Sequence, residues 1–241
     1  ITASAADTVT FNGKSALSDI EFTVEDTASG IDTSKIVFTI GKNEITAEKA
    51  DYGTISSTKV NESDDLKYTV KLSISATQAA ALVAEVNTNA LSSGSTYSIS
   101  ATLYDKAGNY ATQTARSIEV DTTAPTVKIT APNNKENYVK STRDVTLAIN
   151  DVGTVKSAKY AIFKAITDGS KYESATPLAE ADLSFDADTS VSPSLKIDIS
   201  SLLTSTDASK KLSDGDTFVV CVKATDNAEN ESSYDNGVSS T

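Results

Sequence analysis

Acidic and amide residues in two short loops are the side chains of this sequence with the clearest chemical potential. Asp105-Lys106-Ala107-Gly108-Asn109 and Asp226-Asn227-Ala228-Glu229-Asn230 each place an Asp four residues before an Asn. Calcium prefers carboxylate and carbonyl oxygens, so Asp105 and Asp226 are candidate calcium ligands. Asp and Asn are equally typical of tight turns, where they bond to their own backbone. The absence of a dense Asp-x-Asp-x-Asp loop favours the turn interpretation, and the calcium interpretation stays open beside it.

Missing residue types exclude several other chemistries. The chain has no His, no Trp and no Met, and it has one Cys. Without His, neither a Ser-His-Asp nor a Cys-His nucleophile can be assembled, and a typical zinc site is excluded as well. Acid pairs such as Asp64–Asp65 and Asp214–Asp216 are expected by chance among 33 acidic residues. A glycosidase also needs a cleft, usually with aromatic platforms. We therefore predict that the chain is not an enzyme.

The charge balance limits the partners. The 241 residues include 21 Lys and Arg against 33 Asp and Glu, a formal net charge of -12. Nucleic acids and anionic membranes require basic patches, so neither is an expected partner. The apolar run 79–84 is too short to insert into a bilayer. One Cys forms no internal disulfide, and 65 of the 241 residues are Ser or Thr, a composition that we associate with bacterial surface proteins.

Internal similarity indicates that the chain is a duplicated unit. The alternating segment 20–26 is matched by 145–151, which lies 125 positions later and also ends in Asp. At the same offset Phe38 falls on Phe163. Gly94-Ser95-Thr96-Tyr97 matches Gly215-Asp216-Thr217-Phe218 at an offset of 121. We predict two homologous domains, residues 1–121 and 122–241.

The junction between the predicted domains contains Pro125, which favours an extended backbone in the preceding residue. We therefore expect a short, stiff linker instead of a flexible Gly/Ser tether. The start of the chain resembles the segment after the linker, so we also expect the two domains to be part of a longer series.

Alternation of apolar and polar residues with a period of two predicts an antiparallel β-sandwich in each domain. A short helix over 76–88 is the exception in the first domain, with Leu82, Val83 and Val86 at helical spacing and Ser75 or Thr77 as N-cap. The second domain is four residues shorter here, so only a single turn is expected around Leu202. The predicted strands are 8–11, 18–25, 35–40, 67–75, 95–104, 110–120, 126–131, 143–150, 157–164, 193–199, 216–225 and 233–239.

The Asp105–Asn109 loop is followed by a strand and then by Asp121-Thr122-Thr123-Ala124-Pro125-Thr126-Val127. This combination resembles the tandem bacterial immunoglobulin-like (Big-type) repeat domains of surface proteins and adhesins. The resemblance covers both domains. It implies an all-β fold of two tandem immunoglobulin-like antiparallel β-sandwiches, with a short helix inserted in the first. Tyr97 would form a tyrosine corner, which Phe218 in the second domain cannot do.

The resemblance also implies a function. Such repeats serve as non-enzymatic spacers or stalks of extracellular cell-surface or secreted proteins, here an adhesin. The expected partners are neighbouring repeats, with a host or cell-surface protein or a glycan as a further candidate.

An immunoglobulin-like topology would bring several acidic residues to the joint between the domains. The loop after the second strand and the loop before the last strand lie at the same end of such a sandwich. Asp121, Asp151, Asp226 and Glu229 would then converge as ligands of an interdomain calcium ion, which would stiffen the joint as in adhesins built from similar repeats. The alternative is that these residues only form turns.

Two other functions compete with the spacer. One is a ligand- or carbohydrate-binding module, which would present exposed tyrosines to sugars. The other is a set of accessory repeats in a secreted glycan-active enzyme. Cys221 is expected to point away from the core and to be half-buried. The candidate tyrosines are Tyr52, Tyr68, Tyr104, Tyr110, Tyr138, Tyr160, Tyr172 and Tyr234.

Overall fold

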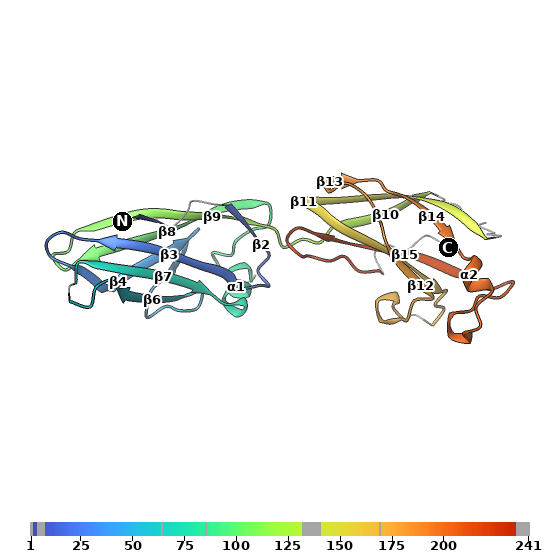
Figure 1. Cartoon of the computed structure of the whole chain (residues 1–241), viewed down its shortest axis with the longest axis horizontal. Helices are drawn as coiled ribbons and strands as arrows, with labels where there is room; N and C mark the ends of the chain where they lie inside the picture. Colours follow the sequence, from blue (N-terminus) through green and yellow to red (C-terminus); the bar gives the residue numbers. More distant parts are fainter. Residues whose placement is uncertain are drawn as a thin grey trace. The chain divides into compact units, whose positions relative to one another are not determined.

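The chain forms two compact units, Ile1–Thr122 and Thr123–Thr241. The computed structural model describes residues 2–3, 8–63, 65–84, 86–131, 141–168 and 170–234 (Figure 1). Both units are built mainly of strands, and each is an immunoglobulin-like β-sandwich. No helix in the described part of the chain is long and apolar enough to cross a membrane.

The first unit packs a four-stranded sheet against a five-stranded sheet (Figure 1). All pairs are antiparallel except β2 with β9, which is parallel. This arrangement is the two-layer pattern of immunoglobulin domains. The four-stranded sheet has the order β1 (Thr2–Ala3), β3 (Leu17–Glu25), β7 (Lys67–Ile74), β6 (Thr54–Lys59), and the five-stranded sheet has the order β2 (Thr8–Phe11), β9 (Tyr110–Val120), β8 (Ser95–Asp105), β4 (Ile31–Ile40), β5 (Asn43–Ile45).

Alternation along the strands gives the first unit its core. In β3 the apolar residues Ile20, Phe22 and Val24 are buried and the residues between them are exposed. Phe22 meets Phe38 of the facing sheet edge-on, with ring centroids 5.5 Å apart. Such aromatic pairs stabilise beyond their buried area, so this contact ties the two layers together.

Helix α1 (Ala76–Val83) crosses from one sheet to the other and confirms the predicted helix in part. Ser75 is its N-cap, and a reciprocal capping box joins Ser75 to Gln78. The helix ends earlier than predicted, because the backbone of Ala84 is already extended. Val86, which was expected on the apolar face of the helix, is instead exposed.

Tyr97 forms the predicted tyrosine corner. Its hydroxyl oxygen accepts a hydrogen bond from the backbone N–H of Ser92 at 3.1 Å, and its ring packs against the core. Phe218 holds the corresponding position in the second unit and supplies only the apolar ring.

The second unit is organised around one long strand, β11 (Thr142–Lys164). The two strands predicted over 143–150 and 157–164 are continuous, and Val155 between them pairs with Asp188 and Asp226. The predicted strand 233–239 lies mostly outside the described residues. The remaining elements are β10 (Thr126–Ala131), η1 (Tyr172–Ser174), β12 (Ala179–Asp182), β13 (Asp188–Val191), β14 (Ser194–Asp198), α2 (Ser200–Leu203), η2 (Ala208–Lys210) and β15 (Phe218–Asp226), all of which Figure 1 shows as one unit.

Strand register corrects one predicted correspondence between the units. Phe38 pairs with Ala101 on β8, and the matching residue on β15, Val222, pairs with Tyr160. Phe38 therefore corresponds to Tyr160 and not to Phe163. The cause is a register irregularity of β4 between Asp32 and Val37, which shifts this strand relative to its counterpart.

A second, smaller apolar cluster covers the outer side of β11 and β15 in the second unit. Cys221 points away from the main core, as predicted, but it is 0% exposed instead of half-buried. The aromatic rings of Tyr172 and Tyr234 lie 5.4 and 5.5 Å from that of Phe163 within this cluster. Residues distant in sequence therefore bury the thiol. The cluster, called the outer cluster below, consists of Ala161, Phe163, Val219, Cys221 and Tyr234, with Ala165, Tyr172 and Ala175 packed against it.

Candidate metal centre

The turn from Asp226 to Asn230 closes the end of β15. The Asp226 carboxylate accepts the backbone N–H of Asn230 on Oδ1 at 2.8 Å and the Asn230 side-chain amide on Oδ2 at 2.9 Å. Both residues are 0% exposed. A carboxylate has about four acceptor sites, so these two bonds leave acceptor capacity on both oxygens of Asp226.

Asp151 lies beside this turn in the same unit. Backbone pairing of Val155 with Asp226, and a bond from the Asn227 N–H to the Thr154 carbonyl at 2.9 Å, hold β11 against the end of β15. As a result, carboxylate oxygens of Asp151 and Asp226 lie within 4.8 Å of each other. Two carboxylates so close repel when both are ionised, and a cation between them relieves that repulsion.

Glu229 takes part in the turn. It has a left-handed backbone with φ of 64°, the conformation that Gly108 adopts in the first unit. Its side chain is 67% exposed and lies 3.9 Å from the Lys156 ammonium group. These features favour the turn interpretation for Glu229.

Asp121 stands at the end of the first unit. Its backbone N–H donates to the carbonyl of Phe11 at 2.9 Å, and its Oδ1 accepts from the Ser93 hydroxyl at 3.5 Å. The residue is buried. Only residues 122–125 separate it from β10, the first strand of the second unit. Asp121 is thus held by its own unit at the point where the chain leaves it.

The first unit contains the homologous turn at Asp105. Asn109 donates to its two carboxylate oxygens at 2.8 and 2.7 Å, the same pattern as in Asp226–Asn230. The bond from the Asn109 side chain lowers the pKa of Asp105 below its ordinary value. Asp26, the counterpart of Asp151, accepts backbone N–H groups of Gly30 at 2.6 Å and Ala28 at 3.1 Å, and these lower its pKa.

Lysines make this end of the first unit different. Lys106 and Lys59 place their ammonium groups 2.6 and 2.5 Å from the two carboxylate oxygens of Asp65. Together with the Tyr68 hydroxyl at 3.1 Å, they hold the pKa of Asp65 far below its usual range. Such a group stays ionised and is unsuited to general acid catalysis. Asp64, the other member of that predicted acid pair, lies outside the described residues.

The other predicted acid pair is also engaged in local contacts. Asp216 accepts the backbone N–H of Ser213 at 2.9 Å and lies 3.3 Å from the Lys164 ammonium group. Both interactions lower its pKa. The pair Asp214–Asp216 therefore belongs to a salt-bridged turn.

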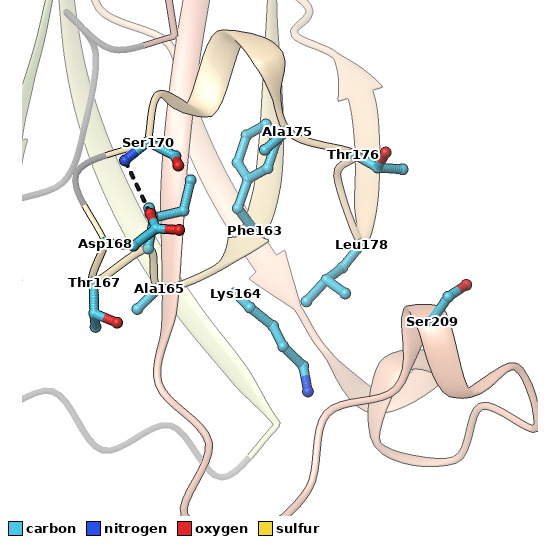
Figure 2. A pocket seen from close by; sticks show the side chains of 11 residues that line it. Phe163, Lys164, Ala165, Thr167, Asp168, Ser170, Ala175, Thr176, Leu178 and Ser209 are labelled. Atoms are coloured by element: carbon cyan, nitrogen blue, oxygen red, sulfur yellow. Dashed lines mark hydrogen bonds between the residues drawn. The ribbon is translucent and has the colours of Figure 1, made fainter.

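A depression of about 420 Å³ lies beside Lys164 in the second unit (Figure 2). Phe163 and Leu178 line its apolar part, and Asp168 lies at its rim. The Asp168 carboxylate accepts the backbone N–H of Ser170 at 2.9 Å, which lowers its pKa. The lining residues that we describe bring no second carboxylate near Asp168, so the depression offers no acid pair for hydrolysis.

Comparison with known proteins identifies no family for this chain. No protein-family model and no curated protein matches the sequence. Similar solved structures include fibronectin(III)-like modules of Clostridium thermocellum CbhA, with 16% identity, a TM-score of 0.30, and coverage of 95% of this chain and 85% of that one.

Two further structures are similar at the same level. Dimeric latent PorU from Porphyromonas gingivalis has 14% identity and a TM-score of 0.29, over 95% of this chain and 18% of that one. The chicken CNTN1 FN1–FN3 domains have 12% identity and a TM-score of 0.29, over 96% and 61%. The chain thus spans less than two thirds of each of these two structures. Similarity of function does not follow at these identities and TM-scores.

Proposed function

We propose that this chain is a non-catalytic segment of tandem immunoglobulin-like domains in an extracellular protein, in which it spaces other parts, and that calcium stiffens the joint between its domains. The extracellular setting is supported by the acidic, Ser/Thr-rich composition with a single cysteine. In this proposal the repeats are Big-type domains of a bacterial adhesin, and their partners are the neighbouring repeats.

The observation that carries the calcium proposal is the fully buried carboxylate of Asp226 beside Asp151. Among the residues that the structure describes, Asp226 has Asn230 as hydrogen-bond donor but no ion pair. Burying a charged carboxylate next to a second one is costly unless a positive charge compensates. Calcium, which takes six to eight oxygen ligands in flexible geometry, fits two neighbouring carboxylates.

Asp121 is the proposed third ligand. Four linker residues span at most about 14 Å, so the linker allows Asp121 to reach the end of the second unit that carries Asp151 and Asp226. Ser93 already orients the Asp121 carboxylate. A cation bound by residues on both sides of the linker would restrict its bending. Glu229 is assigned to the turn and not to the ligands.

Isothermal titration calorimetry with calcium chloride, and thermal unfolding with calcium or a chelator, test this proposal. We expect saturable binding and a higher Tm of the second unit with calcium, because a ligand of the native state stabilises by mass action. Asp151→Asn should abolish both effects, and Asp121→Asn should weaken them.

Asp26→Asn is the matched control, since Asp26 occupies the position of Asp151 in the first unit. This variant should bind calcium like the unaltered chain. Absence of binding at millimolar calcium, or equal loss in the Asp26 and Asp151 variants, would contradict the calcium joint. Small-angle X-ray scattering tests the spacer role separately, since calcium should narrow the distribution of distances within the unaltered chain only.

A further inference from the structure

The first unit presents two tyrosines on an open sheet face, and the other candidate tyrosines do not share this property. Tyr52, Tyr68, Tyr160, Tyr172 and Tyr234 pack against apolar clusters of their own units, and Tyr138 lies outside the described residues. Tyr110 is 69% exposed. Its ring centroid lies 5.5 Å from that of Tyr104 on the neighbouring strand, at an interplanar angle of 41°.

The register of β4, β8 and β9 places these rings in an ordered surface. Directly opposed residues of antiparallel strands share one face. Three neighbouring strands span about 10 Å across the sheet. Each set of directly opposed residues forms a row across the three strands, and successive rows lie next to one another along the strand direction. The face, called the tyrosine face below, consists of the row Asp32–Tyr104–Tyr110, the row Val37–Thr102–Thr112 and the row Thr39–Ser100–Thr114.

The chemistry of this face combines aromatic rings with hydroxyl groups and one carboxylate. The hydroxyls of Thr102 and Thr112 lie 2.8 Å apart on adjacent strands. The Asp32 carboxylate accepts from the Ser34 hydroxyl at 2.6 Å and lies 3.2 Å from the Lys35 ammonium group. These contacts lower the pKa of Asp32, so it remains an acceptor at neutral pH. Lys35 offsets its charge. The residues of the other two rows are uncharged, and Glu44 of β5 pairs beside Thr39 at the edge of the face.

We propose that the tyrosine face binds a neutral polysaccharide, with a pyranose ring stacked on Tyr110 and Tyr104. Aromatic faces stack on the apolar C–H side of a sugar ring, while hydroxyl and carboxylate groups bind its hydroxyls. The hydroxyl groups of the two uncharged rows suit a neutral ligand, and Glu44 at the edge of the face and the net charge of -12 both disfavour an anionic glycan.

In the second unit the equivalent face of the sheet is part of an apolar cluster instead of an open surface. There the residues that match Ser98 and Ser100 are Val219 and Cys221, and Tyr234 and the half-buried Tyr172 pack with them in the outer cluster. In the first unit the corresponding side of the sheet carries Ser and Thr, and Tyr110 remains in solvent. A cross-strand pair would stabilise the hairpin as well, so the test must separate binding from folding.

Affinity electrophoresis and tyrosine fluorescence test the proposal. Hydroxyethylcellulose, arabinoxylan and galactomannan serve as neutral polymers, and polygalacturonate is the anionic comparison. The chain has no Trp, so its tyrosine emission is directly readable. We expect retardation by at least one neutral polymer and none by polygalacturonate.

Four variants separate stacking from folding. Tyr110→Ala should weaken binding by roughly tenfold or more, as truncation of an aromatic hot spot does, while Tyr110→Phe should retain it. Asp32→Asn should weaken it less. Val152→Ala, which truncates an exposed apolar side chain of the second unit, is the control and should bind normally.

Three outcomes would overturn the proposal. The first is that no neutral polymer retards the chain. The second is that Tyr110→Ala, shown to be folded by its thermal transition, binds unchanged. The third is that Tyr110→Ala abolishes a concentration-dependent self-association instead, which would make the face a contact between copies. None of these results depends on calcium, so the calcium joint can fail while the tyrosine face stands.

Discussion

Strands β8 and β15 are equivalent in the two units, yet only their inner faces are alike. The inner face of β8 carries Ile99, Ala101 and Leu103, and that of β15 carries the equally buried Val220, Val222 and Ala224. The outer face of β8 is hydroxylated and open. The outer face of β15 is apolar at Val219 and Cys221, which pack in the outer cluster with Tyr234.

The fold therefore requires apolar residues on the inner face of this strand and leaves the residues of its outer face free to vary. The inner residues are interchangeable apolar groups, since any of them fills a sandwich core. The outer residues decide whether the sheet is extended by a second core or remains a surface. In the second unit the outer face packs in the outer cluster and contributes to stability. In the first unit it is exposed to solvent and accessible to a ligand.

Removing the central ring of the outer cluster should have the largest effect. Phe163→Ala should destabilise the second unit by about 3–5 kcal/mol, because the buried ring leaves a cavity between Tyr172 and Tyr234. Urea unfolding would measure the loss of unfolding free energy, and hydrogen-exchange mass spectrometry would show that it falls in the second unit. Thr102→Ala on the open face of β8 is the control, expected within about 0.5 kcal/mol of the unaltered chain. An equal loss of stability in both variants would contradict the conclusion that the outer face is a core in the second unit and a surface in the first.

Substitutions at Cys221 of β15 and at the equivalent Ser100 of β8 should have an intermediate effect on stability. Cys221→Ser should cost about 1–3 kcal/mol, because it buries a hydroxyl in apolar surroundings. Ser100→Cys, at the equivalent position of β8, should change the free energy of unfolding by less than about 0.5 kcal/mol. Equilibrium urea titrations measure both. If Cys221→Ser were as mild as Ser100→Cys, the outer cluster would not act as a core.

The smallest effect should come from the polar border of the outer cluster. Glu173 accepts the backbone N–H of Tyr234 at 2.8 Å and lies 3.3 Å from the Lys223 ammonium group, so its pKa is below the ordinary 4.5. A depressed folded pKa gives stability that is fully present above 4.5 and lost as the pH falls through the folded value. The effect should be small because the side chain is 41% exposed.

The measurement is the Tm of the second unit from neutral to acidic pH. Glu173→Gln should lower the Tm at neutral pH and flatten its decline on acidification. Glu44→Gln is a control on an exposed residue of β5. A decline as steep in Glu173→Gln as in the unaltered chain would show that other carboxylates govern acid unfolding.

Much of the fold could be predicted from the sequence where a strand is half-buried. The period of two located β3, β7, β8, β9 and β15 closely, because one face of each strand packs in a core. Strand β6 (Thr54–Lys59) was missed, since it lies at a sheet edge and is exposed along almost its whole length. Its sequence therefore carries no alternation.

Long-range packing explains two further errors. The pairing of Phe38 with Phe163 was wrong because a register irregularity leaves no mark in an ungapped comparison. The burial of Cys221 depends on Tyr172 and Tyr234, which are distant in sequence. For the candidate site, the prediction grouped Asp151 with Asp226, whose carboxylates do lie close together in the second unit. The role of Asp121 and the presence of calcium stay predictions.

Strand β11 has a consequence for cooperativity. It pairs with β10, β13 and β14 in its first part and with β12 and β15 in its second part, so one uninterrupted segment belongs to both layers of its sandwich. In the first unit the corresponding strands β3 and β4 are separated by a loop. Local opening of either layer of the second unit must therefore disturb the other, which makes that unit a single foldon instead of two sheets that can loosen in turn.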